Sequence, residues 1–70
     1  MSLLEGLQDV AEALREGAYI HAQQDLESLV CMANDQTIRQ WLVNAITSAS
    51  VGDCSTALTY VSAAIRKLGG

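Results

Sequence analysis

The candidate metal ligands and nucleophiles that this sequence singles out are His21, Asp25, Cys31 and Cys54. His21 and Asp25 are four residues apart, so they would share one face of a helix. A metal site on this pair would need further ligands, and the only other soft candidates are Cys31 and Cys54. Neither cysteine stands at a finger-like spacing from the other or from His21. We therefore expect a surface histidine beside a carboxylate, and no metal site.

Nucleophilic catalysis by a Cys–His pair would require groups that activate the thiol, and none stands near Cys31 or Cys54 in the sequence. The chain also has no glycine-rich phosphate loop, no motif of paired carboxylates and no serine nucleophile elbow. Its 70 residues leave little room for a ligand pocket of the usual volume. We expect a protein that is not an enzyme, binds no cofactor and keeps both thiols reduced.

Charge and hydropathy exclude further classes of function. Eight acidic residues against four basic ones give a net charge of −4. The basic residues are dispersed along the chain, whereas a surface for nucleic acid or for an anionic membrane needs them clustered. No apolar run reaches the roughly 18 residues of a membrane span, and the N-terminus does not resemble a signal peptide. We therefore expect a cytoplasmic protein that binds neither nucleic acid nor membrane.

Apolar residues recur at steps of three and four and never alternate, which predicts an all-α fold. Half of the residues are apolar and there is no proline. The pattern predicts a single helical domain over residues 1–70, with four short helices in two antiparallel hairpins, 2–33 and 36–68. The apolar stripes of the four helices are Leu3, Leu7, Val10, Ala11 and Leu14; Tyr19, Ala22, Leu26, Leu29, Val30 and Ala33; Ile38, Trp41, Leu42, Ala45, Ile46 and Ala49; and Ala57, Val61, Ala64, Ile65 and Leu68.

Residues at the expected helix ends support these boundaries. Ser2 and Glu5 form a capping box, and Asp53 is a good N-cap for the last helix. Either Asn34 or Asp35 can cap the third helix. A shift of 35 residues places the first hairpin on the second with the stripes and the turn glycines, Gly17 and Gly52, in register. This agreement predicts a helix-turn-helix repeat.

The second hairpin, over residues 38–68, carries Trp41, Ala45, Gly52, Ala57 and Ala64 in a pattern that resembles a tetratricopeptide repeat. Trp41 matches that family's tryptophan early in the first helix, and Ala45 matches the small residue one turn later. Gly52 matches the turn glycine, and Ala57 and Ala64 match the small residues of the second helix. The fold is therefore expected to be either tetratricopeptide-like or a four-helix bundle.

The sequence also departs from the family pattern. Ser48 and Val61 stand where the family has aromatics, and the closing proline is missing. In the first hairpin, Gly6 replaces the tryptophan, and only Gly17 and Ala22 are kept. The resemblance is accordingly closer in the second hairpin than in residues 3–33.

The resemblance implies a concave face lined by the first helix of each pair. An apolar concave face would suit an amphipathic helix of a partner protein. The alternative is that the same residues form a core closed by the other helices or by a second copy of the chain. Carried over to this sequence, the concave positions are Leu4, Leu7, Ala11, Leu14, Arg39, Leu42, Ile46 and Ala49.

We therefore expect a small protein–protein interaction module, namely an adaptor, a co-chaperone or an inhibitor, engaged in a homodimer or a hetero-complex. A self-assembling homodimeric regulator is the alternative. A DNA-binding regulator is the third hypothesis, because the last two helices could form a helix-turn-helix. Its recognition helix would be poor in groups that read bases or bind phosphate. The polar side chains that this helix would present to DNA are Thr56, Thr59, Ser62, Arg66 and Lys67.

Overall fold

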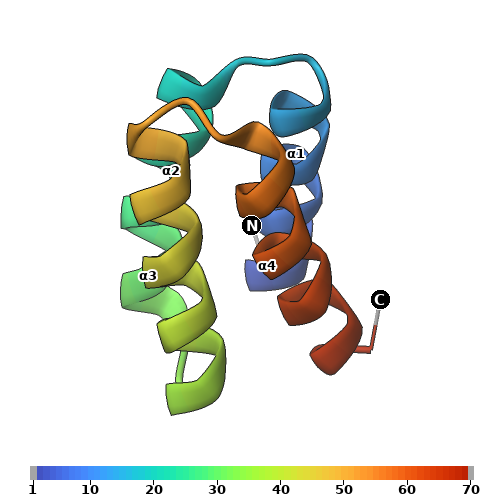
Figure 1. Ribbon diagram of the computed structural model, residues 1–70. Helices are drawn as coiled ribbons and strands as arrows, with labels where there is room; N and C mark the ends of the chain where they lie inside the picture. The colour runs from blue at the N-terminus through green and yellow to red at the C-terminus, as the bar shows by residue number, and fades with distance from the viewer. Residues whose placement is uncertain (1, 70) are drawn as a thin grey trace.

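The computed structural model describes residues 2–69 and contains four α-helices (Figure 1). The helices are α1 (Leu3–Arg15), α2 (Tyr19–Met32), α3 (Gln36–Ser50) and α4 (Cys54–Lys67). The described residues form no strand. The all-α prediction and the two antiparallel hairpins are therefore confirmed, with boundaries within one or two residues of those expected.

Hydrogen bonds at the helix starts explain three of these boundaries. The hydroxyl of Ser2 accepts the backbone N–H of Glu5 at 3.1 Å, which caps α1. Of the two candidates for the start of α3, Asp35 is the cap, because its Oδ1 accepts the backbone N–H of Thr37 at 2.8 Å. Asp53 caps α4 as expected. Each carboxylate or hydroxyl satisfies an N–H that has no partner within its helix.

The turn between α1 and α2 ends the first helix with a left-handed residue. Gly17 has a φ of +80°, a conformation in which a side chain would be strained. The N–H of Gly17 donates to the carbonyl of Leu14 at 3.1 Å, and the N–H of Ala18 donates to that of Ala13 at 2.9 Å. This pair of bonds is a Schellman motif, which satisfies carbonyls left free at the helix end.

The turn between α3 and α4 repeats this motif 35 residues later. Gly52 has a φ of +79°. Its N–H donates to the carbonyl of Ala49 at 2.9 Å, and the N–H of Asp53 donates to that of Ser48 at 2.9 Å. The two hairpins therefore share the same turn geometry as well as the same spacing of apolar residues.

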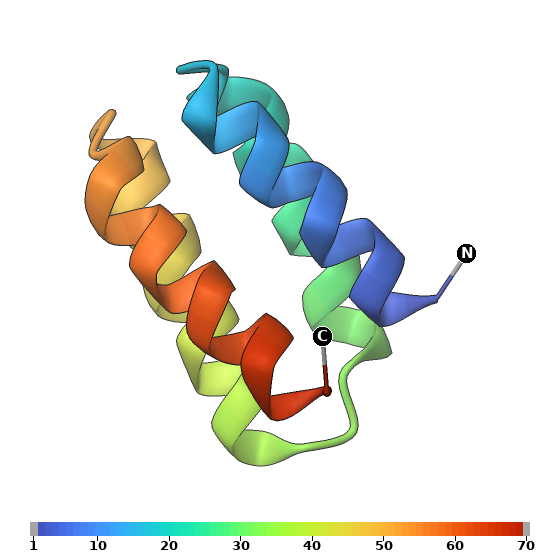
Figure 2. The same ribbon diagram turned by 90° about the vertical axis from the view of Figure 1, so that its right-hand side faces the viewer.

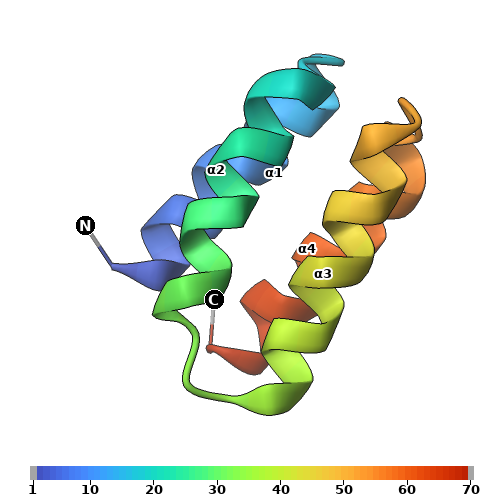
Figure 3. The same ribbon diagram turned by 90° about the vertical axis from the view of Figure 1, so that its left-hand side faces the viewer.

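The hairpins pack side by side, with both turns at one end of the bundle and the α2–α3 loop at the other (Figures 2 and 3). Each helix contacts two neighbours, because α1 packs against α2 and α4, and α3 packs against α2 and α4. This closed ring of contacts is the packing of a four-helix bundle. At the loop end, Nζ of Lys67 lies 3.8 Å from Oδ2 of Asp35.

The core fills the centre of the ring and holds no polar side chain among the described residues. Alanine supplies seven of its 15 residues, and this allows the helices to approach closely. Trp41 is half-buried and packs against the edge of this core. The core residues are Leu7, Val10, Ala11, Leu14, Ala22, Leu26, Leu29, Ala33, Ile38, Leu42, Ala45, Ala49, Ala57, Val61 and Ala64.

The cap of α4 should make stability fall at acid pH. The N–H and hydroxyl of Thr56 bond to the Asp53 side chain and lower the pKa of that carboxyl below its ordinary value of 3.8. A carboxyl whose pKa is lower in the folded state stabilises the fold above its unfolded pKa, and this stabilisation is lost as the pH falls through the folded pKa. The thermal midpoint, followed by circular dichroism from about pH 5 to about pH 2, should therefore fall less in Asp53→Asn than in the wild type. Equal falls in the two proteins would contradict this assignment.

Candidate interaction surface

The structure places most of the predicted partner-binding residues inside the bundle. Because α4 closes over α1 and α2 closes over α3, the stripes expected to line a concave face point into the centre. These side chains offer almost no surface to a partner while the bundle is closed. The five residues concerned are Leu7, Ala11, Leu14, Leu42 and Ala49, all at most 3% exposed.

Three of the eight predicted residues keep accessible surface. Leu4 and Ile46 are half-buried, and Arg39 is exposed in the second turn of α3. They lie at the edges of the stripes rather than along the centre, which is why the closed ring leaves them accessible. The structure therefore leaves these three side chains accessible and places the other five in the core.

α2 presents large apolar side chains to solvent as well as to the core. It buries Leu26 and Leu29, yet Tyr19, Ile20 and Met32 are 39%, 61% and 44% exposed. Tyr19 and Ile20 stand in its first turn, and Met32 in its last. Tyr19 was expected in the buried stripe, but it is the first residue of α2 and is exposed. Outside α2, the exposed large apolar residues among those described are Val43, Val51 and Leu68.

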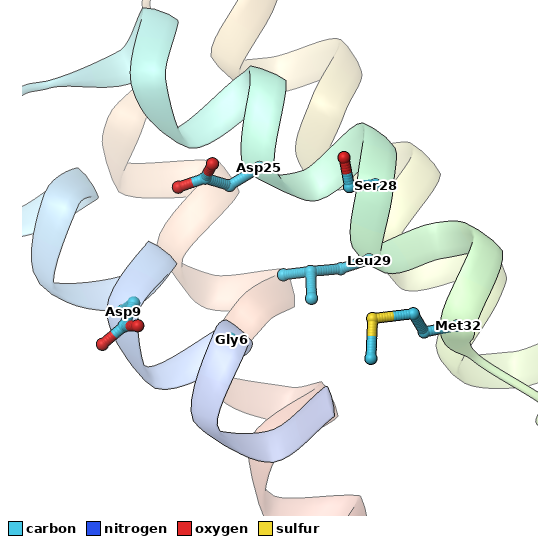
Figure 4. Close-up of a pocket in the computed structure, with 6 residues that line it drawn as sticks. All are labelled: Gly6, Asp9, Asp25, Ser28, Leu29 and Met32. Atoms are coloured by element: carbon cyan, nitrogen blue, oxygen red, sulfur yellow. The ribbon is translucent and has the colours of Figure 1, made fainter. Parts of the chain in front are cut away.

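A hollow of about 170 Å³ opens on the outer side of α1 and α2. Figure 4 shows the carboxylates of Asp9 and Asp25 toward one end of the hollow and Met32 at the other. Leu29 forms part of its floor, between these groups. The two helices thus place apolar surface and two carboxylates at one site. The lining residues are Gly6, Asp9, Asp25, Ser28, Leu29 and Met32.

The hollow depends on a close approach between Gly6 and Leu29. Gly6 is buried and lies near the start of α1, and the side chain of Leu29 points at it (Figure 4). A Cβ on Gly6 would come within 2.5 Å of a methyl carbon of Leu29. Sequence reasoning noted Gly6 only as a departure from a family pattern. A glycine inside a helical stripe was the signal that another residue lies very close.

The four reactive side chains of the sequence are not gathered into one site. His21 and Asp25 both lie on exposed parts of α2. Cys31 is exposed near the end of α2, Cys54 is half-buried at the start of α4, and both thiols are free. Within residues 2–69, no group of three or more His, Cys, Asp or Glu side chains is arranged to hold a metal ion.

The fold and this surface define an all-α four-helix bundle with an apolar and acidic outer face on its first hairpin. Comparison with protein-family models, with curated proteins and with solved structures found no match to this chain. The tetratricopeptide resemblance therefore rests on the residues quoted for it. Across the described residues, none of the four helices has both the length and the apolar character needed to cross a bilayer.

Proposed function

We propose that this chain is a small protein–protein interaction module, in which a closed helical bundle presents the exposed apolar side chains of α2 to a partner. The observation that carries the proposal is the distribution of apolar side chains around α2. A surface helix of a small protein normally keeps its large apolar residues on the core side. α2 also exposes Tyr19, Ile20 and Met32, which suits a helix with a second contact to make.

The partner would be a protein segment with apolar side chains of its own, and an amphipathic helix is the simplest such segment. Binding of this kind fits an adaptor, a co-chaperone or an inhibitor. Free thiols on both hairpins agree with a reducing compartment, and we place the protein in the cytoplasm. Of the predicted contact residues, Leu4, Arg39 and Ile46 remain accessible to extend the interface.

Polar substitutions on α2 should weaken binding without unfolding the bundle. The double variant Ile20→Gln, Met32→Gln removes apolar surface that is 61% and 44% exposed, so the core is left intact. Loss of two apolar anchors should lower the affinity for the partner by roughly tenfold or more. The measurement is affinity capture of a partner from an extract of the protein's own cells, followed by titration of the purified pair.

Val43→Gln is the matched control, because Val43 is 43% exposed but belongs to α3. It should bind the partner as the wild type does. Sedimentation and an apolar dye complete the test on the isolated protein. A strict monomer with no dye binding, and no captured protein that the α2 variant loses, would contradict an interaction function.

A further inference from the structure

The negative charge of this protein is concentrated in its first hairpin. Residues 2–33 carry six acidic side chains and one basic one, a net charge of −5. Residues 34–69 carry two acidic and three basic side chains, a net charge of +1. The two hairpins lie side by side (Figures 2 and 3). The α1–α2 side of the bundle is therefore strongly acidic, and the α3–α4 side is not.

The hollow between α1 and α2 lies within this acidic side. Its volume of about 170 Å³ is below the roughly 300–1,000 Å³ of sites for free small molecules, so it suits one side chain of a larger partner. Leu29 and Met32 offer that side chain apolar contacts, while Asp9 and Asp25 lie beside it (Figure 4). An apolar side chain with a cation close by on the same surface complements both features.

We propose that this hollow is the docking site for a basic amphipathic helix of a partner protein, with one apolar side chain in the hollow and lysine or arginine near Asp9 and Asp25. The inference rests on the proposed interaction function and adds the chemistry of the partner. Opposite charge steers association and selects among partners.

Charge also favours a different protein over a second copy as the occupant. Two copies that each carry a net charge of −4 repel one another. The basic residues outside the first hairpin are Arg39, Arg66 and Lys67. Lys67 already lies 3.8 Å from Asp35 within its own chain. A basic segment of another protein is not repelled by the acidic hairpin, and its cations are not already paired within this chain.

The probe for this site is a synthetic amphipathic peptide of lysine and leucine, titrated by fluorescence anisotropy. Two matched peptides carry glutamate in place of lysine, or serine in place of leucine. The lysine–leucine peptide should bind most tightly, and its affinity should fall as salt screens the carboxylates. In the double variant Asp9→Asn, Asp25→Asn, its affinity should fall roughly five- to tenfold.

The control variant Glu16→Gln, Glu27→Gln removes the same charge from the same hairpin at residues that do not line the hollow. Glu16 lies about two turns beyond Asp9, and Glu27 lies on the other side of α2 from Asp25. The control variant should keep the affinity within about twofold of the wild type, because surface charges at a distance are screened. Ser28→Leu, at an exposed position, should fill the hollow and reduce binding while circular dichroism still shows a folded bundle.

Three results would overturn the assignment. Equal losses of affinity in the two double variants would mean that the overall charge, and not the hollow, determines peptide binding. Equal binding of the glutamate peptide would refute a basic partner, while the proposed interaction function would stand on its own test with the α2 variants. Sedimentation that shows a dimer of the wild type, dissociated by Asp9→Asn, Asp25→Asn, would make the occupant a second copy.

Discussion

Replacing Leu42 with glutamate should unfold the protein. Leu42 is 0% exposed in α3, within a core that contains no polar side chain among the described residues. A carboxylate there would be buried without a partner, at a cost of several kcal/mol. The free energy of unfolding of a small domain is only about 5 kcal/mol or somewhat more in total. Far-ultraviolet circular dichroism should therefore show loss of helix even at low temperature.

Val43→Glu is the matched control, because it introduces the same charge one residue further along the same helix. Val43 is 43% exposed, so its carboxylate stays in water and the bundle should melt within about 5 °C of the wild type. If Leu42→Glu stayed folded with an unchanged midpoint, Leu42 would lie on an open face. That is the arrangement which the tetratricopeptide resemblance implies and which the closed ring of helices does not have.

Leu26→Ala should be the most damaging of the conservative truncations on α2. Leu26 is 0% exposed and is among the largest fully buried side chains. Its removal leaves a cavity that the neighbouring helices cannot fill without moving, at a cost of about 2–5 kcal/mol. In a domain of this size the thermal midpoint should fall by roughly 10 °C or more, or the transition should disappear. A calorimetric or circular dichroism melt measures the change.

Ile20→Ala gives the comparison on the same helix. Ile20 is 61% exposed, so little packing is lost, and alanine is the better helix former. Its effect on the free energy of unfolding should stay within about 0.5 kcal/mol. Similar losses from Leu26→Ala and Ile20→Ala would mean that α2 does not face the core as the structure has it.

The helices and turns of this protein follow from short-range features of its sequence. Asp53 stands three residues before Thr56, whose backbone N–H it caps, and Gly52 can adopt the positive φ that its turn needs. Such interactions involve residues only a few positions apart, so they can be predicted without the tertiary structure. The 35-residue register between the hairpins was predictable for the same reason, and the two Schellman turns reproduce it.

The interaction surface was only partly predictable. An apolar stripe shows which side chains are to be buried, but it does not show whether a neighbouring helix or a partner protein buries them. Leu42 and Ile46 belong to one stripe, and the packing of the helices left the first fully buried and the second half-exposed. The sequence predicted contact residues on α1 and α3, whereas the exposed apolar side chains of α2 all lie outside that predicted set.

The sequence by itself therefore determined four helices, the caps of α1 and α4 and the glycine turns, because these depend on hydrogen bonds between residues close in the chain. The tertiary structure alone decided that α1 packs on α4 and α2 on α3, which closes the stripes into a core. It also brought Gly6 against Leu29 and placed Asp9 and Asp25 in the lining of one hollow. These pairs are distant in sequence and meet only through the packing of one helix on another, which is decided by the fit of whole helical faces.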